Sequence, residues 1–320
     1  MRVWITVVAA LVWLPGLVMA ASDASNEAFG WLQKMANAAR QTDYQGIYIY
    51  QSGGQVETAR ITHLFDETGE HEKVEALDQM PRELIRNNDD VICYFPDTRH
   101  VVAERRKPKK SFPALLPVSV TELGDNYNAR LGGQERISGF DCQVVVLEPR
   151  DGMRYGYRFW ADQNSGLIIR AMTIGEKGEP LDQYTFTQLN VGARIDKEQL
   201  KPRLAGKRLV WRNDPAGEIA AVDSQWGVRQ LPSGFRKVSE TRRNMPGKKT
   251  PVTHSVFSDG LATVSLFVEP LEDAVRRRQG PSGQGAINVY ARTLPEAQIT
   301  VLGEVPAAAV KQIAHSVTRK

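Results

Sequence analysis

The sequence is poor in cysteine and histidine and lacks the short motifs on which most catalytic and metal sites depend. Its 320 residues include two cysteines and five histidines. No HxxxH, CxxC, GxSxG or phosphate-binding loop pattern occurs, and the histidines are scattered: His63, His71, His100, His254 and His315. Without a recognisable nucleophile, base or ligand set, the sequence predicts a binding protein rather than an enzyme, and no cofactor or metal is expected.

Long apolar runs are also absent after the first twenty residues. Arg2 precedes an apolar run from Val3 to Leu14, and Val18-Met19-Ala20 is a small-residue cleavage signal. This run is too short to span a bilayer. We therefore expect residues 1–20 to be an export signal that is cleaved after Ala20. The pattern is typical of bacterial export, so a soluble periplasmic chain is expected.

The charge balance is close to neutral. The chain has 41 Lys and Arg against 37 Asp and Glu, a formal net charge of +4, which falls by one when the segment containing Arg2 is removed. An acidic protein partner or anionic lipid headgroups fit this mild basicity. An exported chain is not expected to meet nucleic acid.

The two cysteines, Cys93 and Cys142, both lie in predicted strands. In an oxidising compartment one disulfide between them is expected. The alternative is a pair of buried thiols in neighbouring strands, because the sequence does not fix the short Cα separation that a disulfide requires.

The stretch from Phe140 to Val191 is the centre of the predicted fold. Four runs rich in β-branched and aromatic residues are separated by turn clusters at 149–152, 162–166 and 176–180. This pattern predicts a four-stranded antiparallel meander. Apolar spacing predicts a helix over Asn26–Arg40, and a short helix is expected within Val120–Tyr127.

Some six further short strands are predicted between residues 44 and 104, so the first domain (residues 21–191) is expected to be a strongly curved sheet or barrel wrapped around its helices. Residues 192–206 are the predicted linker. The second domain (residues 207–320) is expected to be a smaller antiparallel sheet that begins with a strand at Arg208–Arg212 and ends with a helix after Pro306. Residues 276–285 are predicted to form a flexible basic loop. The fold class is therefore α+β, mostly β.

One candidate site is a set of aromatic residues on the predicted strands. They either form ordinary core or line a pocket for acyl chains, and the residues alone do not decide between the two. The set comprises Tyr48, Tyr50, Tyr155, Tyr157, Phe159, Tyr184 and Phe186.

A second candidate site is the loop predicted after residue 104. Basic residues are followed there by apolar ones between two prolines, so the loop is either solvated or meets a lipid, with phosphates on the basic residues and chains on the apolar ones. These residues are Arg105, Arg106, Lys107, Lys109, Lys110, Phe112, Leu115 and Leu116.

Several segments, in order along the chain, together resemble the RseB/MucB family of periplasmic sigma-factor regulatory proteins. In the first half they are Asp43–Tyr50, Gly139–Cys142, Arg154–Trp160 and Phe186–Asn190. In the second half they are Trp211, Leu231–Phe235, Phe257–Ala262, Phe267–Leu271 and Val301–Pro306.

This resemblance implies a large domain similar to the Lol lipoprotein carriers, an unclosed β-barrel with helices in its mouth. It also implies a protein that binds the periplasmic domain of an inner-membrane anti-sigma factor of the RseA or MucA type and protects it from proteolysis. Lipopolysaccharide or related lipid is then the releasing signal, and self-association is expected. The alternatives are a lipid or lipoprotein carrier without a regulatory role, an envelope hydrolase, and a purely structural interaction module.

Overall fold

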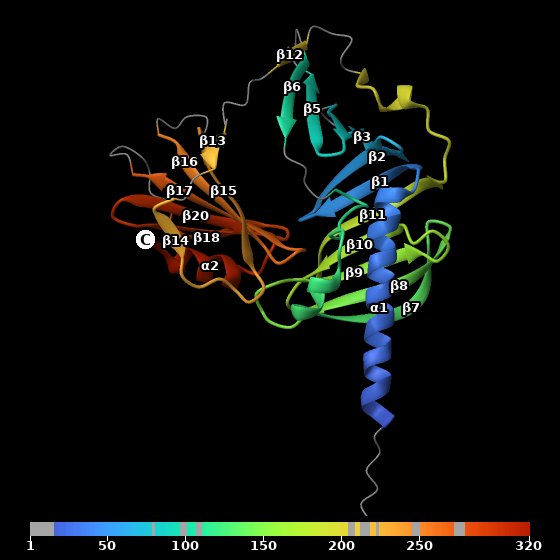
Figure 1. Ribbon diagram of the computed structural model, residues 1–320, viewed down its shortest axis with the longest axis horizontal. Coiled ribbons are helices and arrows are strands. Elements are labelled where there is room, and N and C mark those ends of the chain that lie inside the picture. Colours follow the sequence, from blue (N-terminus) through green and yellow to red (C-terminus); the bar gives the residue numbers. More distant parts are fainter. Residues whose placement is uncertain are drawn as a thin grey trace, which may run out of the picture.

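The computed structural model describes residues 16–78, 81–96, 101–106, 111–203, 209–211, 218–221, 224–244, 250–271 and 279–320. In this part of the chain the strands form a twelve-stranded sheet, a seven-stranded sheet and a two-stranded ribbon. Figure 1 shows the two larger sheets side by side, each with one α-helix against it. The expected fold class, mostly β with few helices, is confirmed.

The large sheet has the strand order β12-β6-β5-β4-β3-β2-β1-β11-β10-β9-β8-β7. The meander predicted from Phe140 is confirmed as strands β8 to β11, which pair in antiparallel order. The strands are β1 (Tyr44–Ser52), β2 (Gln55–Asp66), β3 (Gly69–Ala76), β4 (Glu83–Asn87), β5 (Asp90–Pro96), β6 (Val101–Arg106), β7 (Tyr127–Ile137), β8 (Phe140–Pro149), β9 (Gly156–Asp162), β10 (Ile168–Ile174), β11 (Pro180–Val191) and β12 (Leu209–Trp211).

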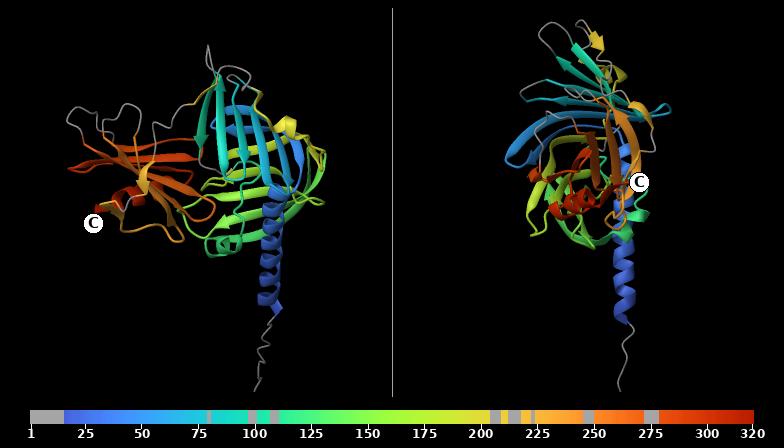
Figure 2. Two further views of the ribbon diagram at one scale, coloured as in Figure 1. Left: turned by 45° about the horizontal axis from the view of Figure 1, so that its top comes forward. Right: turned by 90° about the vertical axis from the view of Figure 1, so that its left-hand side faces the viewer.

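Helix α1 (Gly16–Gln41) packs against one face of the strongly curved large sheet from Ala28 onward (Figures 1 and 2). Its apolar positions recur at the predicted helical spacing, and Leu32, Met35 and Ala39 are buried against the sheet. The short 3₁₀ helix η1 (Thr121–Asp125) follows later in the chain and adds Leu123 to the same core. A second short helix, η2 (Lys197–Leu200), lies in the predicted linker.

The smaller sheet has the order β13-β15-β16-β17-β20-β19-β18, and helix α2 (Ala307–Ser316) packs on one face of it. The Asp259-Gly260 turn joins β16 to β17, as turn chemistry predicts. The strands are β13 (Glu218–Ala221), β15 (Arg236–Arg243), β16 (Val252–Ser258), β17 (Thr263–Pro270), β18 (Gly280–Gln284), β19 (Ile287–Thr293) and β20 (Ala297–Gly303), while β14 (Trp226–Val228) and β21 (Val317–Arg319) form the ribbon.

Two predictions about the second half of the chain were wrong. The strand expected at Arg208–Arg212 exists as β12, but it pairs in parallel with β6 of the large sheet rather than opening the second domain. Residues 280–284, expected within a flexible loop, form β18 and pair with β19. In both cases backbone pairing with a distant strand outweighs local composition, which alone gives no sign of such a partner.

The predicted disulfide was also wrong. Cys93 lies on β5 and Cys142 on β8, and seven strands separate them in the sheet, so no disulfide links them. Both side chains are buried. Burial, more than the nearby carboxylate of Asp162, raises the pKa of the Cys142 thiol to about 11, so this thiol is protonated at neutral pH.

Among the described residues, no helix has the length and apolar character needed to cross a membrane.

Candidate functional site

Four aromatic residues form a cradle on the face of the large sheet that α1 also covers. Tyr48 and Tyr50 come from β1, and Tyr184 and Phe186 come from the neighbouring strand β11. The Tyr50 and Tyr184 rings stack with centroids 4.5 Å apart, and Tyr48 meets Phe186 edge to face at 6.1 Å. We call these four residues the aromatic cradle.

Gly46 makes room for one wall of the aromatic cradle. A Cβ atom at this position would lie 2.9 Å from the Phe186 ring and 2.6 Å from the backbone oxygen of Gln188. Only glycine therefore lets the β1 backbone approach β11 closely enough for Phe186 to lie under it.

A short stretch of the chain itself covers the aromatic cradle. Residues 111–117, which we call the covering segment, place Phe112 against three of the cradle rings, with centroid distances of 4.8 Å to Phe186, 5.2 Å to Tyr48 and 5.3 Å to Tyr184. Phe112 and Leu116 are each 1% exposed. Aromatic pairs of this kind each contribute about 0.5–1.5 kcal/mol beyond the area they bury.

The residues of the second predicted site do not form one open loop. Phe112 and Leu116 were expected on an open loop but are buried. The aromatic cradle offers Phe112 an apolar surface, Leu116 joins the core of the large sheet, and Leu115 packs against this core half-buried. Arg105 and Arg106 belong to β6, where they pair with Ile92 and Val91, and not to a loop. Lys107, Lys109 and Lys110 lie outside the described residues.

Polar contacts hold both ends of the covering segment. The Ser111 hydroxyl donates to Oε1 of Glu72 at 3.2 Å, and Nη2 of Arg40 in α1 donates to the Leu116 carbonyl at 2.6 Å. Just beyond, Nε2 of Gln33 donates to the Val118 carbonyl at 2.8 Å. The segment has no regular secondary structure, so side chains of α1 and β3 supply these partners for its backbone and its first hydroxyl.

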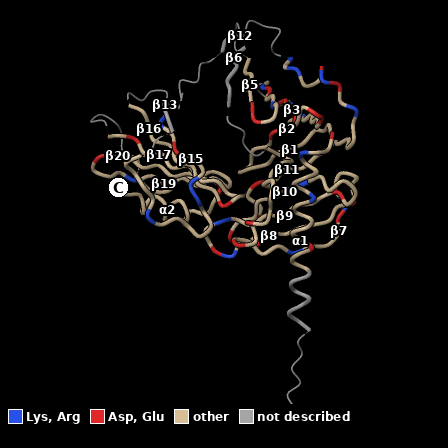
Figure 3. The backbone as a smooth tube through the Cα atoms, in the orientation of Figure 1, with Lys and Arg blue, Asp and Glu red and all other residues tan. Residues whose placement is uncertain are grey.

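A group of buried charges lies beside Ser111 on strands β2 to β4, a region where Figure 3 shows acidic positions in red. Arg86 Nη1 is 3.6 Å from Oε1 of Glu70, and its Nε is 4.0 Å from Oε1 of Glu72. Burial raises the pKa of Glu72, partly offset by Arg86. Burial also acts to raise the pKa of Glu70, but His63 and Arg86 outweigh it and the pKa is lowered.

The other aromatic residues of the predicted pocket divide into two groups. Tyr157 and Phe159 stack at 6.0 Å further along the same core, and Tyr157 also borders a groove of about 590 Å³ near the loop at 149–152. Tyr155 does not join them. It precedes β9, and its hydroxyl accepts a hydrogen bond from Asn288 of the smaller sheet at 2.8 Å.

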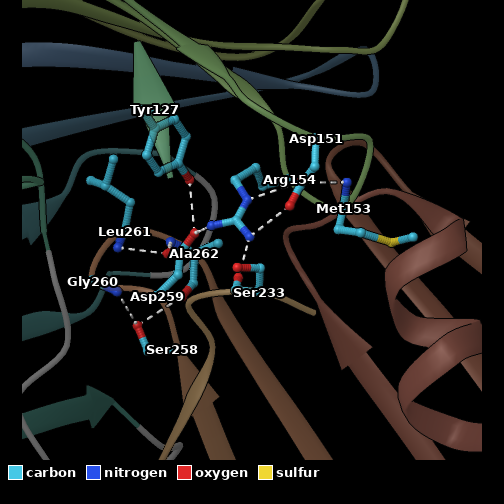
Figure 4. A network of polar contacts seen from close by, with 10 residues as sticks. All are labelled: Tyr127, Asp151, Met153, Arg154, Ser233, Ser258, Asp259, Gly260, Leu261 and Ala262. Carbon is cyan, nitrogen blue, oxygen red and sulfur yellow. Dashed lines mark hydrogen bonds and ion pairs between the residues drawn. The ribbon is translucent and has the colours of Figure 1, made fainter. Parts of the chain in front are cut away.

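A buried ion pair joins the two larger sheets, as Figure 4 shows. Nη1 of Arg154, in the loop before β9, lies 2.8 Å from Oδ2 of Asp259 in the β16–β17 turn, and both side chains are fully buried. The same Oδ2 accepts a hydrogen bond from the Tyr127 hydroxyl at 3.0 Å. We call Tyr127, Arg154 and Asp259 the domain latch.

Further contacts complete the coordination of the domain latch. Oδ1 of Asp259 accepts the backbone N–H groups of Leu261 and Ala262, at 2.9 and 2.8 Å. Arg154 also donates to Asp151 and to the Ser233 carbonyl, and its guanidinium lies over the rings of Tyr127 and Phe235. Breaking such a pair on one side costs about 3–5 kcal/mol, because it leaves a buried charge without its partner.

Sequence reasoning missed the domain latch. Asp259 was recognised only as a turn residue, and Arg154 only as part of a motif, because nothing local relates two positions so far apart in the chain. The one available signal was an arginine in a turn-rich stretch between apolar strands. No group of three or more His, Cys, Asp or Glu residues suited to a metal ion occurs in the described part of the chain.

Comparison with known proteins matches both halves of the chain. Residues 27–204 match the MucB/RseB N-terminal domain, and residues 220–318 match the MucB/RseB C-terminal domain. The sequence is 31% identical to the sigma factor AlgU regulatory protein MucB of Pseudomonas aeruginosa, over 93% of this chain and 91% of that protein. It is 26% identical to the sigma-E factor regulatory protein RseB of Escherichia coli K12, over 94% of each.

The fold agrees with these sequence matches. The structure of the Pseudomonas aeruginosa MucA/MucB complex aligns with a TM-score of 0.74 and 28% identity, covering 92% of this chain and 99% of that one. Tyr127, Arg154 and Asp259 of the domain latch lie within the residue ranges that match the two family domains. The chain belongs to the MucB/RseB family.

Proposed function

We propose that this protein is a periplasmic negative regulator of an envelope-stress sigma factor of the sigma-E or AlgU type. It binds the periplasmic domain of an inner-membrane anti-sigma factor of the RseA or MucA type, protects that domain from proteolysis, and releases it on sensing lipopolysaccharide or another lipid. The observation that carries the proposal is the match across both domains to MucB, whose structure is known as a complex with MucA.

The domain latch suits a protein that grips its partner with two domains. A partner that touches both sheets binds most tightly when their relative orientation is already fixed, because less conformational freedom is lost on binding. Tyr127, Arg154 and Asp259 fix that orientation with buried, charge-assisted contacts.

The lipid part of the proposal rests on the aromatic cradle. We infer that the large sheet is an unclosed barrel wrapped on α1, with an apolar inner face. Its edge strands β12 and β7 each have a single neighbour among the described strands. The covering segment fills the space over the cradle with Phe112 and Leu116, side chains about as apolar as an acyl chain. A lipid chain that replaced them would keep the rings of Tyr184 and Phe186 out of water.

The protein is proposed to be exported and to consist of two domains joined by a linker. Residues 1–20 act as the signal, residues 21–191 form the large domain and 192–206 the linker. β12 (Leu209–Trp211) adds to the large sheet, and the small domain follows it. Mass determination of the exported protein is expected to give a chain that begins at Ala21. Self-association is expected as well, and sedimentation velocity over a range of concentrations measures it.

Capture by an immobilised anti-sigma periplasmic domain tests the proposed function. Purified mature protein is passed over the domain, and lipopolysaccharide is then added in a titration. Capture that falls as lipopolysaccharide rises is expected, with a lipid-free polysaccharide of the same sugar content as the control. Absence of capture would sink the regulatory function, and rescue of lipoprotein sorting by this protein would then favour a lipid carrier.

A further inference from the structure

One continuous piece of chain lies in both candidate sites. Residues 111–117 cover the aromatic cradle, and residues 118–127 run from there, through η1, to Tyr127 of the domain latch. Phe112 at one end contacts the cradle rings, and Tyr127 at the other end contacts Asp259. The two sites are therefore joined by about fifteen residues of backbone.

The far end of this piece is packed against the smaller domain at several points. The Leu123 side chain lies against the backbone of Gly260, where an added Cβ would be 3.3 Å from it. Glu122 forms an ion pair with Arg236 of β15. Leu261, next in the β16–β17 turn, packs into the core of the large sheet. The turn therefore rests directly on η1.

The link between the two ends is short and hydrogen-bonded. The N–H of Leu123 donates to the Val120 carbonyl at 3.0 Å, and the N–H of Asn126 donates to the Leu123 carbonyl at 3.0 Å. Val120 and Leu123 are 4% and 1% exposed, so their side chains are fixed in the core. A shift of the backbone at residue 117 is therefore expected to be transmitted to Tyr127, because the packed residues between them can absorb little of it.

We propose that residues 111–127 couple the aromatic cradle to the orientation of the two domains. An acyl chain that enters the cradle expels Phe112 and Leu116, and the resulting shift of η1 weakens the hydrogen bond from Tyr127 to Asp259. The smaller domain is then held less firmly, although the Arg154–Asp259 pair remains. This inference rests on the proposed function for its biological meaning, since loosened domains would release a partner held by both.

The coupling is reciprocal, which makes it testable without the anti-sigma factor. If an acyl chain in the cradle weakens the latch, then a weaker latch favours binding of the acyl chain. Tyr127→Phe removes only the hydroxyl that donates to Asp259 and keeps the buried ring. Tyr155→Phe is the matched control, because the Tyr155 hydroxyl also bonds across the two sheets, to Asn288, but lies outside residues 111–127.

The first experiment measures the affinity for dansyl-undecanoate by fluorescence titration of the whole mature protein. Tyr127→Phe is expected to bind about threefold to tenfold more tightly than wild type, the change that corresponds to loss of one hydrogen bond. Tyr155→Phe is expected to bind within about twofold of wild type. Equal affinities for wild type and Tyr127→Phe, or the same gain in Tyr155→Phe, would overturn the coupling.

A second experiment needs no lipid. Phe112→Ala loosens the covering segment, so hydrogen exchange in the peptide containing residues 258–262 is expected to rise. Ile169→Ala, an equally buried truncation on β10, is the control and is expected to leave that peptide unchanged. Unchanged exchange in Phe112→Ala would contradict the coupling, whether or not any variant binds the probe. Absence of probe binding in every variant would refute lipid sensing, which is a separate conclusion.

Discussion

The two larger sheets are covered in different ways. The smaller sheet is covered by α2, a regular helix whose Val310, Ile313 and Ala314 are buried in one continuous stripe. The large sheet is covered partly by α1 and partly by residues 111–117, which have no regular structure. One cover satisfies most of its own backbone hydrogen bonds, whereas part of the other depends on side chains from elsewhere.

This difference determines whether α2 or residues 111–117 can detach from its sheet while the domain stays folded. Removing α2 would expose a whole apolar stripe and break a helix, so it is expected to occur only with unfolding of the domain. Detaching residues 111–117 would expose two large side chains and break the contacts made by Arg40 and Ser111. Detaching part of the cover of the large sheet is therefore expected to cost less than removing the cover of the smaller sheet.

Truncation of the α2 stripe is expected to have the largest effect. Ile313→Ala removes a fully buried side chain from a rigid core, so it should lower the free energy of unfolding by about 2–5 kcal/mol. Urea denaturation followed by circular dichroism measures the change. Gln312→Ala, on the half-buried side of the same helix, is the control and should change stability little.

Truncation in the covering segment is expected to cost less, although Phe112 is larger than Ile313. Phe112→Ala should lower the free energy of unfolding by about 1–2 kcal/mol, because the segment can detach and let water reach its backbone rather than leave a rigid cavity. The same urea experiment measures it. A loss as large as that of Ile313→Ala would show that both covers are equally fixed and would remove the contrast.

The two domains also differ in the direction in which the pKa of a buried carboxylate is shifted. Burial acts to raise the pKa of Glu240, but the Ser224 N–H and the Ser255 hydroxyl, both at 2.8 Å, and Lys237 outweigh it and lower the pKa. Because the folded pKa lies below the ordinary value of 4.5, Glu240 stabilises the fold above about pH 4.5, and this contribution is lost as pH falls through the folded pKa.

Glu240→Gln should therefore lower stability by about 1–2 kcal/mol at pH 7 and by less as the pH falls below 4.5. Thermal unfolding between pH 3 and pH 7 measures this. Glu72→Gln provides the contrast, because burial raises the pKa of Glu72 and its ionised form disfavours folding. No loss at pH 7 is expected there. Equal losses in the two variants would mean that both carboxylates are equally well satisfied.

The smallest effect is expected from reduction. Since Cys93 and Cys142 lie on strands far apart in the sheet, dithiothreitol should leave the melting temperature unchanged. A drop of several degrees would indicate a disulfide and a different strand order. Cys93→Ser, measured without reductant, separates the loss of a disulfide from the cost of placing a hydroxyl in a buried site.

Most of the strands could be predicted from the sequence, but little of the geometry of the candidate sites could. The meander after Phe140 and the Asp259-Gly260 turn could be predicted, because alternating apolar residues and turn-forming residues in the local sequence indicate them. The burial of Phe112 could not be predicted, because its neighbours in sequence are charged and its partners, such as Tyr184, lie far along the chain. Tyr155 was assigned to the pocket by alternation, but it precedes β9 and contacts the other sheet.

Strand β12 also bears on the order in which the molecule assembles. Leu209–Trp211 pairs in parallel with Val101–Ala103, so the intervening chain, which includes β7 to β11, forms the crossover between them. Closing so large a loop is entropically costly, and such contacts form late. During synthesis the large sheet cannot be completed until β12, which follows the linker, has been made. Completion of the large sheet and the start of the smaller sheet therefore occur at about the same time.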